Sequence, residues 1–487
     1  MVEAETELTE RERANRERAK QDPVDAQEEG VVGGWGGSCG IAEVLALAIP
    51  LMISTASWTL MQVTDRVFLL WHSKAEMAAA MPAGMLLFTL QSFPLGVLSY
   101  LNTFVAQYDG AERPDEIGRV MGQGLWIAAI FTVPALALIP FAPTLFLLAG
   151  HGAEMAGREA IYFQILSYGV PAGYLAQTYS TFYTGRGHVM LVMCVNIGAA
   201  LLNIVLDYVW IFGYFGFPEG GIAGAAWATI TAEWAKAITF AICLYASPDN
   251  RPFELWKGLN WDSHLIGRIF YFGGTNGLNM FTEVGAFTIF LLVMGQLGEE
   301  AVGATSIAFQ VNSMAFMPVI GMGIAVSTLV GRELGSERPD RAERATWNAL
   351  IVAMIYSIPF AAAYFFLPDW FLMAHEAGVE ASDFVATRDT VAVLLRFVAI
   401  YCLFDTMNVV FVSAIKGAGD MLFVLAATSV IGLTTMSTGV LGLTFWNFGL
   451  IECWWAITGW IVALGLAFLV RFLQGTWREM RVIEPKL

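Results

Sequence analysis

The sequence predicts an all-α polytopic membrane protein with twelve transmembrane helices in two six-helix lobes related by an internal repeat. Of the 487 residues, 57% are hydrophobic and only 14% are charged, whereas about a quarter of the residues in a soluble domain are charged. The apolar runs are as long as helices and show no sustained alternation, so they favour a helical bundle over an outer-membrane barrel. A 24-residue stretch that begins at position 96 also recurs at position 321.

Each predicted span is long enough to cross roughly 30 Å of hydrocarbon at about 1.5 Å per residue. In chain order, the spans are 41–72, 79–107, 120–148, 159–183, 189–213, 221–246, 265–296, 301–330, 342–367, 387–415, 421–445 and 452–474. We therefore expect five parts: an acidic cytoplasmic tail with a Gly-rich joint (1–40), an N-terminal lobe (41–246), a cytoplasmic linker (247–264), a C-terminal lobe (265–474) and a cytoplasmic tail (475–487). The first apolar segment is too long for a signal peptide and is expected to remain as a span.

The distribution of Lys and Arg predicts the orientation of the chain. Of the 26 basic residues, 20 fall in the two tails and the loops on the same side as them, three fall in the opposite loops, and three lie within spans. Because basic residues concentrate on the cytoplasmic side, we expect both termini in the cytoplasm of a multi-pass cell (inner) membrane protein.

The internal repeat links the two halves. "GVLSYLNTFVAQYDGAERPDEIGR" (96–119) aligns with "GMGIAVSTLVGRELGSERPDRAER" (321–344), including the whole Glu-Arg-Pro-Asp string. A related turn occurs near Gly185 and near Gly417. An even number of spans per half gives both halves the same orientation, and transporters built from repeated halves bind substrate between them.

Several motifs in this order resemble one known family. They are "VTDRVFL", "GGIAGAAWATITAEW", "TEVGAFTIFLLVMGQLG", "MGIAVSTLVGRELGSERPDRA" and "LFDTMNVV" with the following "GAGDM". Together they resemble the multidrug and toxic compound extrusion (MATE) family, most closely its NorM branch, over about residues 41–474. The resemblance implies two lobes around a central cleft. It also implies secondary active efflux of organic, mostly cationic, drug-like molecules in exchange for Na⁺ or H⁺.

The resemblance also implies a site in the C-terminal lobe. Glu283 and Asp405 match membrane-embedded acids of the NorM branch, with Gln310 and Asn312 on the eighth span as neutral oxygen donors. An ionised carboxylate in apolar surroundings is costly, so we expect these acids to bind a cation, a proton or a cationic substrate, with a purely structural hydrogen bond as the alternative. For Gln310 and Asn312, hydrogen bonds between helices are an equally good interpretation.

A second implied site lies in the N-terminal lobe. Asp65, Asn203, Asp207 and Thr229 match positions that the family uses for a cation or proton. Asn203 and Asp207 stand four apart and so share one face of a helix, and oxygen donors of these types suit a small hard cation such as Na⁺. A hydrogen-bonded cluster that only joins three helices is the alternative. Arg66 departs from the family, which usually has a small polar residue there.

Other functions remain as alternatives. We find no phosphate-binding loop and no HExxH motif, so we expect no enzymatic activity, no cofactor beyond the coupling ion, and no nucleic-acid partner. A lipid-linked sugar flippase or metabolite exporter of a related superfamily is the main alternative, although a flippase for pyrophosphate would need a strongly cationic cleft. The expected partners are small organic molecules and the lipid bilayer, and we expect a monomer.

Overall fold

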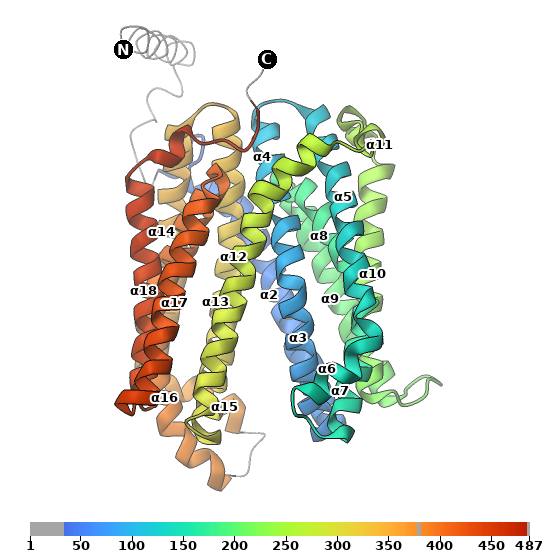
Figure 1. Ribbon diagram of the computed structural model, residues 1–487. Coiled ribbons are helices and arrows are strands. Elements are labelled where there is room, and N and C mark those ends of the chain that lie inside the picture. The colour runs from blue at the N-terminus through green and yellow to red at the C-terminus, as the bar shows by residue number, and fades with distance from the viewer. Residues whose placement is uncertain (1–33, 377–380, 485–487) are drawn as a thin grey trace.

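The computed structural model describes residues 34–376 and 381–484. Residues 1–33 of the expected acidic tail, and residues 485–487 of the expected C-terminal tail, lie outside the described residues. Within them the chain folds into two lobes of long helices, which stand side by side in Figure 1.

The first lobe contains six predicted spans, three of which are broken into two or three helical pieces. Its helices are α2 (Ile41–His72), α3 (Lys74–Ser99) with α4 (Leu101–Gly110), α5 (Pro114–Ala137) with η1 (Ile139–Phe141) and α6 (Ala142–Leu148), α7 (Ala153–Ser167) with α8 (Val170–Gly185), α9 (Val189–Phe212) and α10 (Gly221–Ala246).

The linker and the second lobe complete the chain. The linker holds η2 (Pro248–Phe253) and α11 (Leu255–Gly258). The second lobe follows as α12 (Ser263–Gly295), α13 (Glu299–Gly335), α14 (Pro339–Phe366), α15 (Pro368–Glu376), α16 (Ala381–Ala418), α17 (Met421–Trp446) and α18 (Leu450–Leu473), and η3 (Thr476–Glu479) comes last.

All twelve predicted spans are helical. By length and apolarity, nine stretches of the described chain are able to cross a membrane. The other three predicted spans, 159–183, 221–246 and 265–296, form α7 with α8, α10, and α12. Together these segments make a twelve-helix, two-lobe fold, as predicted.

The internal repeat extends to the backbone conformation of its turns. Glu112 and Glu337 both adopt a positive φ, 53° and 63°, at equivalent positions of the two Glu-Arg-Pro-Asp strings. In each copy the following Pro starts a helix, where its missing N–H costs no hydrogen bond. Short polar turns of the same conformation therefore precede α5 and α14.

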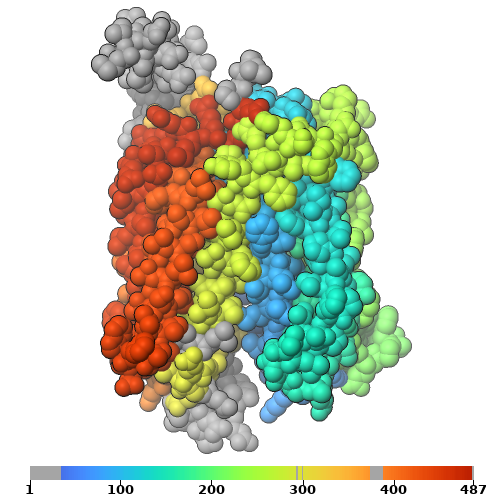
Figure 2. Space-filling view, in the orientation of Figure 1, coloured from blue at the N-terminus to red at the C-terminus, as the bar shows by residue number. Residues whose placement is uncertain are grey.

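The two lobes meet at the end of the bundle where the described chain starts and finishes, which we call the terminal end. At the opposite end, Figure 2 shows a gap between the yellow surface of the second lobe and the blue-to-teal surface of the first. The structure is therefore closed at the terminal end and open at the other.

Contacts at the terminal end are arranged about a pseudo-twofold axis. The side-chain amide of Asn102 donates to the hydroxyl of Thr328 (3.0 Å), and the hydroxyls of Thr103 and Ser327 lie 3.4 Å apart. Positions 102 and 103 are the repeat equivalents of 327 and 328. Each residue thus contacts the equivalent of its neighbour, as expected for a self-complementary interface.

Glycine allows α4 and α13 to approach closely in this interface. A Cβ on Gly110 would lie 1.9 Å from the carbonyl oxygen of Arg332, and one on Gly335 would lie 2.1 Å from that of Gln107. These two contacts are again related by the repeat. No larger residue fits either position unless the backbones move apart.

The hydrophobic core forms two clusters that only partly follow the lobes. One is built mainly from α12 to α18 and also includes Val44, Leu47 and Leu51 from the first half of α2. The other is built mainly from α2 to α10. The first half of α2 thus packs against the second lobe at the terminal end, where α2 contacts α13.

Candidate functional site

Four predicted residues of the first lobe are placed by α2, α9 and α10. Asp65 on α2 is 5% exposed, and Asn203 and Asp207 on α9 are fully buried. The side-chain amide of Asn203 donates to the hydroxyl of Thr229 on α10 (3.4 Å). Asp207 lies one helical turn from Asn203 and interacts electrostatically with Asp65. We refer to these four residues as the N-lobe cluster.

The N-lobe cluster contains buried oxygens without a hydrogen-bond partner. They are Oδ1 of Asp65, Oδ1 of Asn203, and both carboxylate oxygens of Asp207. Buried polar atoms are nearly always paired, and an unpaired one costs free energy. A proton or a small cation would satisfy these oxygens, so the donor set fits a bound ion better than it fits a purely structural cluster.

Tyr162 on α7 contacts the N-lobe cluster, and the sequence did not reveal this contact. Its hydroxyl donates to Oδ2 of Asp65 (3.3 Å), and it also interacts electrostatically with Asp207. A tyrosine in an aromatic-rich membrane chain is usually a packing or interfacial residue. Only its position beside two carboxylates identifies this one.

Arg66 does not enter the cluster as a hydrogen-bond partner. It is exposed, whereas its neighbour Asp65 is buried, because adjacent helix positions point about 100° apart. Within the described residues no group of three or more His, Cys, Asp or Glu side chains is placed to hold a metal ion. The cluster has only two carboxylates, and its other donors are an amide and hydroxyls.

The predicted site of the second lobe is more open. Oδ1 of Asp405 on α16 accepts a hydrogen bond from the amide of Asn408 (3.4 Å), and Oε1 of Glu283 on α12 accepts one from Asn279 (3.0 Å). Asp405 is half-buried and Glu283 is exposed. The two carboxylates interact electrostatically, so the structure brings these two predicted residues together.

Gln310 and Asn312 lie half-buried on α13, which packs against α16. Two further residues join the acids. Tyr401, one turn before Asp405, is 1% exposed, has a hydroxyl without a hydrogen-bond partner, and interacts electrostatically with Asp405. Lys416 near the end of α16 interacts electrostatically with Glu283. The sequence pattern placed Lys416 in a loop, but α16 continues to Ala418.

Known relatives cover most of the chain. It is 28% identical over 411 residues to the multidrug resistance protein NorM of Photobacterium profundum, with 83% of this chain and 88% of that protein covered. It is also 28% identical over 422 residues to the multidrug resistance protein PmpM of Pseudomonas aeruginosa, with coverage of 83% and 85%.

Solved structures share the fold. A crystal structure of MATE in complex with MaL6 superposes with a TM-score of 0.81 at 20% identity, covering 91% of this chain and 96% of that one. The outward-facing conformation of a multidrug resistance MATE family transporter of the MOP superfamily also gives 0.81, at 19% identity and with the same coverage.

The family model named MatE matches this chain twice, over residues 50–209 and 277–441. The two matches fall in the two lobes, and together they cover more than half of the chain. The chain therefore belongs to the MatE family.

Proposed function

We propose that the protein is a secondary active antiporter that exports organic cations or other drug-like molecules in exchange for Na⁺ or H⁺. The observation that carries this proposal is the N-lobe cluster, which holds four buried oxygens without partners in a chain of the MatE family. The relatives named as multidrug resistance proteins support the substrate class.

The N-lobe cluster is the proposed coupling-ion site. Asp65 and Asp207 supply negative charge, while Asn203 and Thr229 supply neutral oxygens from α9 and α10. An ion bound here would neutralise two carboxylates in a membrane interior where charge is expensive. Binding would also draw α2, α9 and α10 together, so that occupancy of the site favours one packing of the lobe.

The acids of the second lobe are the proposed contact for a cationic substrate, or a second position for the coupling ion. Glu283 is exposed, so a molecule in the cleft can reach it. Asp405 lies deeper and can hold a proton or a cation when Glu283 is engaged. Gln310 and Asn312 are proposed as polar contacts on the facing surface of α13.

Transport then requires the two lobes, residues 41–246 and 265–474, to move relative to each other. We place the terminal end in the cytoplasm, because the basic residues concentrate on that side. The structure is then open to the outside, and the substrate enters from the cytoplasm only after the contacts at the terminal end separate. A gradient suffices as the energy source, because one charge crossing 100 mV supplies about 2.3 kcal/mol.

The experiment is efflux of a fluorescent organic cation from proteoliposomes under an imposed Na⁺ gradient or, separately, an H⁺ gradient. The variants are Asp65→Asn and Asp207→Asn in one lobe, and Glu283→Gln and Asp405→Asn in the other. We expect one gradient to drive efflux, and the N-lobe variants to lose that drive.

Glu159→Gln is a matched control. Glu159 is a fully buried carboxylate of the same lobe; its Oε2 pairs with His151 at 2.7 Å, and only its Oε1 has no partner. We expect this variant to keep gradient-driven efflux. If Glu159→Gln lost gradient-driven efflux while Asp65→Asn and Asp207→Asn kept it, the assignment of the ion site would be wrong. If neither gradient moved the dye in the unmodified protein, the proposed drug antiport would fail.

A further inference from the structure

The segment that follows α18 buries three of its side chains, although terminal segments are usually loose. Trp477 and Val482 are fully buried and Ile483 is 8% exposed. The indole of Trp477 stacks on Phe472 with ring centroids 4.9 Å apart. We call residues 477–484 the clasp.

The clasp is anchored to the second lobe along its first half. Arg478 pairs with Glu343 on α14, and Arg481 pairs with Glu337, in the repeated turn after α13, at 3.0 Å. The buried Trp477 fixes the same stretch against α18. These ion pairs attach the first part of the clasp to the second lobe.

The second half of the clasp contacts the first lobe at the buried side chain of Gln107 on α4, and Val482 and Ile483 belong to the hydrophobic cluster built mainly from that lobe. Oε1 of Gln107 accepts hydrogen bonds from the backbone N–H groups of Val482 (2.8 Å) and Ile483 (3.4 Å). Its Nε2 donates to the carbonyl oxygen of Gly417 (2.9 Å), at the end of α16. Gln107 is fully buried, so both ends of its amide are committed to the other lobe.

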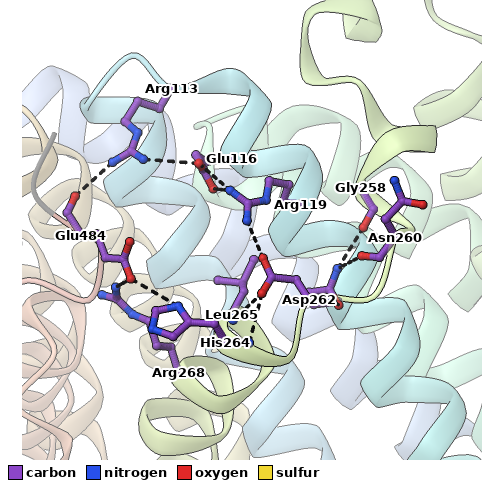
Figure 3. A network of polar contacts seen from close by, with 11 residues as sticks. Arg113, Glu116, Arg119, Gly258, Asn260, Asp262, His264, Leu265, Arg268 and Glu484 are labelled. Atoms are coloured by element: carbon purple, nitrogen blue, oxygen red, sulfur yellow. Dashed lines mark hydrogen bonds and ion pairs between the residues drawn. The ribbon is translucent and has the colours of Figure 1, made fainter. Parts of the chain in front are cut away.

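Charged side chains also hold the end of the clasp, and Figure 3 shows Arg113 and Arg268 in a polar network with Glu484. Arg113, at the start of α5, donates to the backbone carbonyl of Glu484 (3.0 Å). The carboxylate of Glu484 pairs with Arg268 on α12, and Arg268 also donates to the carbonyl of Val482. Both lobes thus bind the clasp, and they do so at the same few residues of the clasp.

We propose that the clasp is a latch of the transport cycle, in which Gln107 is the positioning residue. The clasp holds the lobes together at the terminal end in the state seen here, which is open only at the opposite end. It must detach from Gln107 and Arg113 whenever the terminal end opens. The proposal rests on the proposed alternating access of the two lobes. It explains why a glutamine occupies a fully buried position in the lobe interface, where its amide has a cost unless it is paired.

The physical consequence is a bias in the equilibrium between the two states. When the lobes part, the amide of Gln107 and the two N–H groups of the clasp exchange protein partners for water. Removing the clasp eliminates these interactions in the closed arrangement and leaves the separated arrangement almost unchanged. The population with a separated terminal end must therefore rise.

The test measures the separation of the lobes by electron-electron resonance between spin labels on cysteines that replace Asp115 and Asp340, in a protein whose five native cysteines are replaced. Both positions are exposed on the terminal end at equivalent places of the repeat. The measurement uses reconstituted protein without substrate or gradient. Its outcome is therefore independent of whether the proposed drug antiport is correct.

Three variants and one control are compared: a chain that ends at Met480, Gln107→Leu, Arg113→Ala, and Gln123→Leu. The control residue is also a fully buried glutamine, but its Nε2 donates to the carbonyl oxygens of Gly258 and Asn260 in the linker (3.0 and 2.8 Å). Gln123→Leu therefore removes the same kind of buried side-chain amide as Gln107→Leu, at a position that does not touch the clasp.

We expect the shortened chain and Gln107→Leu to raise the ratio of separated to closed protein about five- to thirtyfold, as for the loss of one or two net hydrogen bonds. Arg113 is half-exposed, so Arg113→Ala is the least disruptive variant and should raise the ratio less. Gln123→Leu should leave the ratio unchanged. Gln107→Leu should also have a smaller effect in the shortened chain than in the full chain, because part of its contact is then already lost. Unchanged ratios in the shortened chain and in Arg113→Ala, or equal effects of Gln107→Leu in both chains, would overturn the proposal.

Discussion

The close crossing of α4 and α13 makes Gly110→Ala a sharp test of how the lobes close. The new Cβ would lie 1.9 Å from the carbonyl oxygen of Arg332. A carbon atom at this position needs about 3.0 Å at the least, so the two backbones must separate by about 1 Å. The obstacle is backbone, which no side-chain rotation can relieve.

The expected free-energy cost follows from the behaviour of overpacked cores. Inserting one methyl group where no space exists costs about 1–3 kcal/mol. The cost applies only while α4 and α13 touch. The helix preference of Ala over Gly, about 1 kcal/mol, acts in both states and cancels. The ratio of separated to closed protein should rise about 5- to 150-fold.

The assay is the same spin-label distance between positions 115 and 340, together with the rate of gradient-driven efflux. Gly335→Ala should behave like Gly110→Ala, because it makes the repeat-related contact, 2.1 Å from the carbonyl oxygen of Gln107. Gly267→Ala is the matched control. Its Cβ would meet nothing within 4 Å, and Gly267 lies near the start of α12, at the terminal end.

We expect Gly267→Ala to leave the distance unchanged and the two interface variants to lengthen it. If Gly110→Ala and Gly335→Ala kept the short distance and full transport, the tight glycine crossing would not be part of the closed state. The reasoning about the interface would then be refuted.

Three further predictions address the ion site, the lobe contact and the linker. Tyr162→Phe removes one hydrogen bond to the N-lobe cluster, and it should raise the half-maximal ion concentration for efflux about two- to tenfold; an unchanged value would exclude a role in the site. A disulfide between Thr103→Cys and Ser327→Cys should stop transport and be reversed by reductant, whereas transport that continues through the cross-link would contradict separation of the lobes at this end. The backbone N–H of Leu265, with further donors, holds the pKa of Asp262 below its usual range. The ionised carboxylate of Asp262 therefore stabilises the fold above about pH 4, and this stabilisation is lost as the pH falls through the lower pKa of the folded state. Asp262→Asn should therefore lower Tm in detergent at neutral pH but not near about pH 2, and an equal decrease at both would contradict this origin.

The twelve helices and the repeat were predictable because they depend on local properties of the sequence. Hydropathy identifies spans, and the bilayer allows few alternatives to helices for them. The shared face of Asn203 and Asp207 follows from helix geometry alone, and the repeat reappears in the positive φ of Glu112 and Glu337. The roles of the site residues, by contrast, stay proposals.

Contacts between distant segments were not predictable in the same way. Tyr162 resembles the many aromatic residues that only fill space, and its pairing with Asp65 depends on how α7 lies against α2. Gln107 has no charge and no motif, so nothing in the sequence marks it as the partner of Val482. The residues after α18 were expected only to form a cytoplasmic tail, because their buried surface appears only once both lobes are in place.

The most direct test of antiport reverses the driving force. Proteoliposomes without any ion gradient receive a steep gradient of the organic cation, and movement of Na⁺ or H⁺ is followed with a radioactive tracer or an internal pH dye. We expect ion movement opposite to the substrate, and its loss in Asp65→Asn and Asp207→Asn. Substrate movement with no counter-movement of either ion would contradict the account.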